Sequence, residues 1–164
     1  MLELFMCFVL YAGTANALPR VAWNKEAPDL SVEPLKEHDA AIKQYFSNPE
    51  VQYVGSTSGC GCDFPNVMLQ NGEWPTLDIP EAEKDEFDKE QDISDRHNRE
   101  LLVNLLRASG NKTVELYGFW IGGKDDFKKS PQAIENIFLV RILESDFRFK
   151  EQVLYRVHLE SDTG

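Results

Sequence analysis

The 164-residue chain carries 28 acidic and 17 basic residues, a formal net charge of −11, and 42% of its residues are hydrophobic. This length predicts one domain, residues 1–164, and the composition is typical of a folded protein and not of a disordered one. The acidity argues against nucleic acid and against an anionic membrane surface, because binding to either requires a basic face that the sequence lacks. A basic protein partner is compatible with this charge.

An apolar run at residues 4–11 opens the chain and allows two interpretations. The sequence Ala15-Asn16-Ala17 resembles a cleavage site, so residues 1–17 can be read as a signal peptide of a secreted or periplasmic protein. No Lys or Arg precedes Arg20, however, whereas signal peptides begin with positive charge. Both faces of the run are apolar, which is typical of a central strand. We therefore predict a first strand and a cytoplasmic protein.

The middle of the chain alternates between helical and extended patterns. Apolar residues recur every three or four positions over 34–46 and predict a helix that ends before Pro49. A β-branched and aromatic run at 51–54 predicts the second strand. Residues 81–95 hold eight acidic residues against two basic ones and are expected to be solvated. A helix then continues to Gly110, with a stripe formed by Leu101, Leu102, Leu105 and Leu106.

The last third contains two predicted strands, at 113–121 and 152–159, and the second is expected to have one face exposed to solvent. Between them, Ser130-Pro131 is a typical helix start and predicts a helix to residue 143, although 137–140 also fits a strand. Residues 160–164 form a polar tail. The pattern predicts an α+β fold with a small, mostly antiparallel sheet of four or five strands and two or three helices packed on one face.

The segment 51–64, VQYVGSTSGCGCDF, holds the one candidate site. Its loop alternates glycine and cysteine at Gly59, Cys60, Gly61 and Cys62. Backbone N–H groups of a glycine-rich loop lower a thiol pKa, whereas burial raises it. Because these fourteen residues include no Lys, Arg or His, we expect burial to dominate the pKa of the thiols and alkylation to be slow.

Zinc binding is an alternative interpretation of the cysteines. Thiolates are zinc ligands, and Cys7, Cys60 and Cys62 with His158 supply a set of four. The single residue between Cys60 and Cys62 differs from the two usual in zinc knuckles. No residue carries a catalytic signature, so an enzyme is not favoured, and no cofactor is expected apart from zinc in this alternative.

Three segments together resemble a small family of uncharacterised bacterial proteins: Cys7-Phe8, the loop from Val54 to Cys62, and Val114 to Gly118. The resemblance implies that residues 1–11 form a strand, and it supplies no activity. We therefore predict a non-enzymatic binding or interaction domain in which the Gly-Cys-Gly-Cys loop is a structural or surface feature. The alternative is a thiol redox or zinc site built from Cys60, Cys62 and possibly Cys7.

Overall fold

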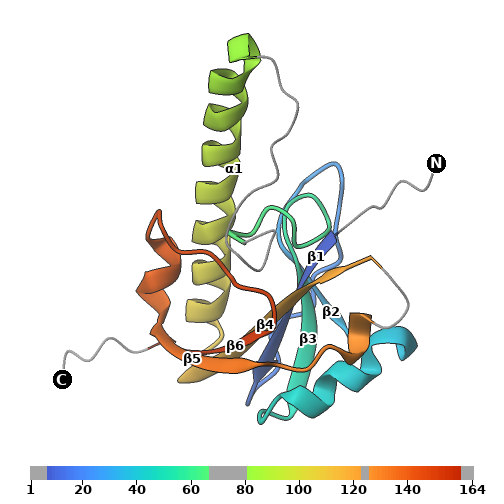
Figure 1. Ribbon diagram of the computed structural model, residues 1–164. Helices are drawn as coiled ribbons and strands as arrows, with labels where there is room; N and C mark the ends of the chain where they lie inside the picture. The colour runs from blue at the N-terminus through green and yellow to red at the C-terminus, as the bar shows by residue number, and fades with distance from the viewer. Residues whose placement is uncertain (1–6, 67–80, 123–125, 160–164) are drawn as a thin grey trace, which may run out of the picture.

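A computed structural model describes residues 7–66, 81–122 and 126–159 of the chain (Figure 1). Six strands form one sheet in the order β2-β3-β1-β4-β6-β5, and all neighbours are antiparallel except β5 and β6, which are parallel. The elements are β1 Cys7–Thr14, β2 Ser31–Pro34, η1 Glu37–Tyr45, β3 Glu50–Gly55, α1 Glu81–Ala108, β4 Thr113–Ile121, η2 Asp126–Lys128, β5 Ala133–Phe138, η3 Leu139–Leu143 and β6 Val153–His158.

Strand β1 lies inside the sheet, paired with β3 on one side and β4 on the other. Leu10 is aligned with Val54 of β3 and with Gly118 of β4, and is fully buried. The strand predicted from the apolar run at 4–11 is therefore confirmed over residues 7–11 and extends to Thr14, whereas residues 1–6 lie outside the described ranges. Cleavage after Ala17 would remove an internal strand from the sheet.

Both faces of the sheet are covered, which corrects the expectation that helices pack on one face. Phe8 and Leu10 of β1 belong to a core shared with Leu102 and Leu106 of α1. The opposite core joins Tyr11 of β1 to Ile42 and Phe46, from the segment that contains η1. Figure 1 shows α1 and η1 on opposite sides of the strands. Double coverage explains why β1 and β4 lack a polar alternation.

Only the C-terminal half of α1 packs on the sheet, and its acidic N-terminal half projects beyond the strands (Figure 1). Four acidic side chains of this half, Glu83, Glu86, Glu90 and Asp92, are exposed, as the acidic pattern predicts. The helix continues unbroken to Ala108, followed by Gly110 in a left-handed conformation with a φ of 73°. The predicted helix end is thus confirmed.

Buried Arg99 joins α1 to η3 and to the turn that follows η3. Its guanidinium donates to the carbonyl oxygens of Ile142 at 2.8 Å, Glu144 at 2.6 Å and Phe147 at 2.8 Å. The Nε of Arg99 also donates to Asp95 at 2.9 Å. An arginine with this many acceptors can remain charged in a buried position.

The predicted helix over 130–143 is wrong. Residues 133–138 form strand β5, and only the short 3₁₀ helix η3 follows it. Ile134, Ile137 and Phe138 have helical spacing, but pairing with β6, a contact distant in sequence, selects the extended conformation. The prediction that one face of β6 is exposed to solvent is confirmed in part. On that face Arg156 and His158 are half-buried, but Leu154 is buried.

The α+β class is confirmed, but the sheet has six strands where four or five were expected. The additional strands are β5 and the four-residue β2, which is too short to produce a pattern and ends in Pro34. The helix predicted over 34–46 is the 3₁₀ helix η1. The polar tail, residues 160–164, lies outside the described residues.

Replacing a leucine of α1 tests the packing of this helix. Leu106 is fully buried, whereas Leu105 is only partly buried. We expect Leu106→Ala to lower the free energy of unfolding by about 2–5 kcal/mol, because it leaves a cavity in the core. Leu105→Ala should cost clearly less in the same urea titration. Equal losses for the two variants would contradict the orientation of the helix.

Candidate thiol site

The cysteine loop follows β3 and is attached to the start of β1. The N–H of Gly61 donates to the carbonyl oxygen of Phe8 at 2.9 Å. A Cβ atom at Gly61 would lie 2.6 Å from that oxygen, so only glycine permits this approach. Within the loop, the N–H of Ser56 donates to the carbonyl oxygen of Cys60 at 2.5 Å and closes a tight turn. Backbone contacts thus fix the position of the two cysteines.

Two side chains from distant segments hold the other end of the loop at Thr57. Asn98 of α1 is fully buried, accepts from the N–H of Thr57 at 3.0 Å and donates to its hydroxyl at 3.1 Å. The indole N–H of Trp23 donates to the carbonyl oxygen of Thr57 at 3.0 Å. Gly59 has a φ of 92° and faces the Trp23 ring, where a Cβ atom would lie 3.3 Å from the ring carbons. The loop is therefore fixed from both sides.

The thiols of Cys60 and Cys62 are free and half-buried. The Cys60 sulfur accepts the backbone N–H of Cys62 at 3.4 Å and lies 3.5 Å from the hydroxyl oxygen of Ser58. Sulfur is a weak acceptor as a thiol and a much better one as a thiolate. Both contacts therefore favour the deprotonated form of Cys60.

The pKa values of the two thiols move in opposite directions. Hydrogen bonding by the Cys62 thiol is the largest cause that lowers the pKa of Cys60, and burial, which opposes it, is outweighed. The same hydrogen bond raises the pKa of Cys62, and burial adds to this effect. The expectation that burial dominates both thiols is thus wrong for Cys60, because neutral donors and not cations stabilise its thiolate.

A cavity of about 270 Å³ reaches the loop at Gly59. Its walls come from β1, β2, β3, β4, η1 and η2, and include the rings of Tyr11, Tyr53 and Phe127. The hydroxyl of Tyr53 donates to the carbonyl oxygen of Gly59 at 3.2 Å. Burial is the main cause of the raised pKa of Tyr53, and the charge of Cys60 contributes to it. The cavity and the Cys60 side of the loop are therefore neighbours.

The four residues of the zinc hypothesis do not come together. Cys7 is aligned with Ile121 and His158 with Thr113, which are opposite ends of β4. The His158 ring instead lies 3.2 Å from the amide oxygen of Asn136. Cys7 is close enough for its charge to raise the pKa of Cys62. Within residues 7–66, 81–122 and 126–159, no group of three or more His, Cys, Asp or Glu side chains is arranged to hold a metal ion.

No family model, curated protein or solved structure matches the chain. The resemblance to a bacterial family therefore remains a prediction. In the part of the chain that the structure describes, no helix is both long and apolar enough to cross a bilayer.

Substitution of Asn98 tests the attachment of the loop to α1. We expect Asn98→Ala to lower the free energy of unfolding by about 1–3 kcal/mol, because it leaves the Thr57 N–H without its acceptor. Hydrogen exchange of the Thr57 amide should accelerate as well. The matched control is Asn104→Ala at an exposed position of the same helix, which should change stability by less than about 0.5 kcal/mol. Unchanged exchange at Thr57 in Asn98→Ala would contradict this attachment.

Proposed function

We propose that the loop is a thiol–disulfide exchange site in which Cys60 is the nucleophile and Cys62 the resolving thiol. The observation that carries the proposal is the position of the Cys60 sulfur, 3.4 Å from the N–H of Cys62 in a loop fixed on two sides. A thiolate, and not a thiol, attacks disulfides, so stabilising the thiolate is the first requirement of this chemistry.

A purely structural role explains the glycines of the loop better than its cysteines. Gly61 is required by the backbone of β1, and Gly59 by its positive φ. Cysteines with a structural role are usually buried and inert, but the side chains of Cys60 and Cys62 are half-buried and both thiols are free. Their pairing in a preformed loop therefore favours reactivity.

The proposed reaction begins when the Cys60 thiolate attacks one sulfur of a substrate disulfide. The substrate S–S bond breaks, a Cys60–substrate disulfide forms, and the other substrate sulfur leaves as a thiolate that takes a proton from water. Cys62 then loses its proton to water and attacks the Cys60 sulfur, and the second substrate sulfur leaves as a thiolate. Two electrons pass from the cysteine pair to the substrate, which becomes a dithiol.

The close spacing of Cys60 and Cys62 determines how stable the disulfide between them is. A disulfide between cysteines with a single residue between them closes a small, strained ring, and strained disulfides are easily reduced. The oxidised pair would readily return its disulfide to another dithiol. This property is more typical of a protein that exchanges or isomerises disulfides than of one that acts as a strong reductant of them.

The pH dependence of alkylation tests the nucleophile. Because the pKa of Cys60 is lowered, its thiolate persists to lower pH, and iodoacetamide should label Cys60 rapidly even at pH 6. Cys60→Ser should remove this labelling, and Cys62→Ala should shift the profile to higher pH by removing the thiol donor. The variant with serine at both loop positions reports labelling of Cys7 alone. A wild-type rate that rises only near the free-thiol pKa of about 8.5 would contradict the proposal.

Binding of a basic protein partner is a second candidate function, favoured by the projecting half of α1. Residues 81–95 carry eight acidic and two basic side chains, and Ile93 among them is 70% exposed. An apolar side chain within a charged surface is typical of a protein interface, because it adds contact area to electrostatic attraction. This candidate retains the binding role expected from the sequence.

Calorimetry with a lysine-rich helical peptide tests this second candidate. Neutralising Glu83, Glu86 and Glu90 with glutamine should weaken binding and reduce its dependence on salt. Ile93→Ser should weaken binding at physiological salt if the surface is a dedicated interface. Binding that is insensitive to Ile93→Ser would indicate general attraction between opposite charges and would contradict this function.

A further inference from the structure

The two edges of the sheet differ in how they are protected. At the β2 edge, Val21 and Val32 exchange two backbone hydrogen bonds of 3.0 and 2.8 Å, and Pro34 has no N–H to offer. At the other edge, β5 pairs only with β6 among the described strands. An edge strand with free backbone groups is a template for pairing with another chain unless charge, proline or a covering segment prevents it.

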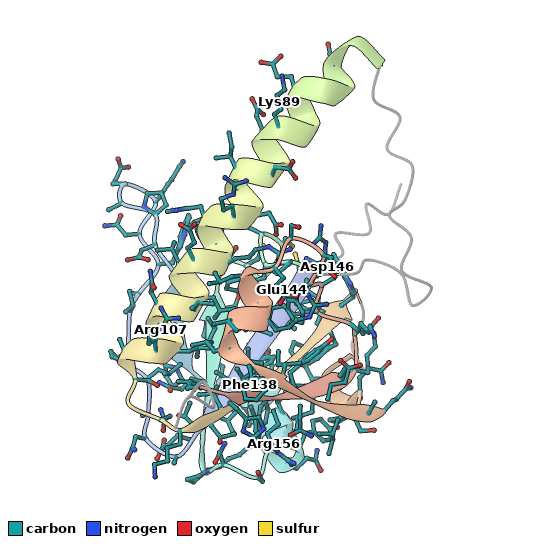
Figure 2. The ribbon with its side chains drawn as sticks, turned by 90° about the vertical axis from the view of Figure 1, so that its left-hand side faces the viewer. Lys89, Arg107, Phe138, Glu144, Asp146 and Arg156 are labelled. Atoms are coloured by element: carbon teal, nitrogen blue, oxygen red, sulfur yellow. The ribbon has the colours of Figure 1, made fainter. Side chains whose placement is uncertain are left out.

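Strand β5 also exposes large apolar side chains. Ile134 and Phe138 are 56% and 51% exposed, and both lie on the sheet face that carries Leu154 and His158 of β6. Figure 2 looks onto the end of the sheet where β5 lies and shows Phe138 close to η3, with Arg156 of β6 below it. Val140 and Leu143 of the following helix η3 are also exposed, at 52% and 42%.

The charge of this region permits two copies to approach each other. Residues 133–158 contain four acidic and four basic side chains, whereas the whole chain has a net charge of −11. Several of these charges are already paired within the region, such as Lys150 with Glu135 and Arg141 with Asp146. Because acidic and basic side chains are equal in number here, association at this edge does not bring an excess of like charge together.

The exposed face of β5, with Ile134, Asn136 and Phe138, is complementary to itself. A two-fold axis perpendicular to the sheet relates two antiparallel β5 strands without exchanging the two faces of the sheet. Residues that lie opposite each other across the pair therefore belong to the same face. Centring the axis on Asn136 aligns Ile134 with the partner's Phe138, and Phe138 with the partner's Ile134. Aromatic and β-branched residues are a favourable cross-strand pair.

We propose that two copies of the chain associate through antiparallel pairing of their β5 strands, centred on Asn136, to form one continuous twelve-stranded sheet. The occupant of the edge is a second copy because the exposed face of β5 aligns Ile134 with the other copy's Phe138, and because acidic and basic side chains are equal in number over 133–158. This inference is independent of the proposed chemistry of the cysteine loop.

Sedimentation equilibrium from micromolar to millimolar concentration tests the association. The wild-type chain should approach twice the monomer mass, and Ile134→Asp and Phe138→Asp should each remain monomeric. Both side chains are exposed, so these variants should keep the wild-type circular dichroism spectrum. The matched control is Ile93→Asp, an exposed isoleucine on α1, which should associate like the wild type. A wild-type monomer at every concentration, or a dimer that survives both β5 substitutions, would overturn the proposal.

Cysteine cross-linking tests the register. In a background with Cys60→Ser and Cys62→Ser, Asn136→Cys should form a covalent dimer under mild oxidation, because the two-fold axis brings residue 136 of each copy together. Asn104→Cys, exposed on α1, is the control and should form little dimer. Equal cross-linking at both positions would contradict the register.

Discussion

The hydrogen bond between the N–H of Gly61 and the carbonyl oxygen of Phe8 connects the internal strand of the sheet to the cysteine loop. Phe8 is fully buried between β4 and the α1 core, so the position of its carbonyl oxygen is fixed. The contact allows no side chain at position 61, and the two cysteines must therefore flank a glycine. The geometry of the candidate site thus depends directly on the position of β1 in the core.

The electrostatics of the loop differ from those of a thiol activated by a cation. The protein is acidic, and Asp63 opposes ionisation of Cys60 by raising its pKa. Hydrogen bonds from the Cys62 thiol, the Ser58 hydroxyl and a backbone N–H outweigh this repulsion. Short-range donors can do so because a hydrogen bond to a charged acceptor is about twice as strong as one between neutral groups, and the loop holds them in place at no further entropic cost.

The sequence predicted the elements whose patterns are local. The apolar first strand, strand β4 and the leucine stripe of α1 follow from alternation or helical periodicity, and the loop was identified from its composition. Strand β5 was missed because its helical spacing is overridden by pairing with β6. The contacts that define the site were not predictable either, since Asn98 and Trp23 lie 41 and 34 residues from Thr57 in sequence. His158 was assigned to the loop because side-chain type alone does not reveal that it lies at the far end of β4.

Trapping of the mixed disulfide tests the central claim, that Cys60 attacks and Cys62 resolves. The variants Cys62→Ser and Cys60→Ser would each be incubated with oxidised glutathione and analysed by mass spectrometry of the intact chain and of its peptides. We expect Cys62→Ser to accumulate glutathione on Cys60, whereas the wild type should release it and Cys60→Ser should react slowly. Equal and slow modification of both variants, or faster modification of Cys62 than of Cys60, would contradict it.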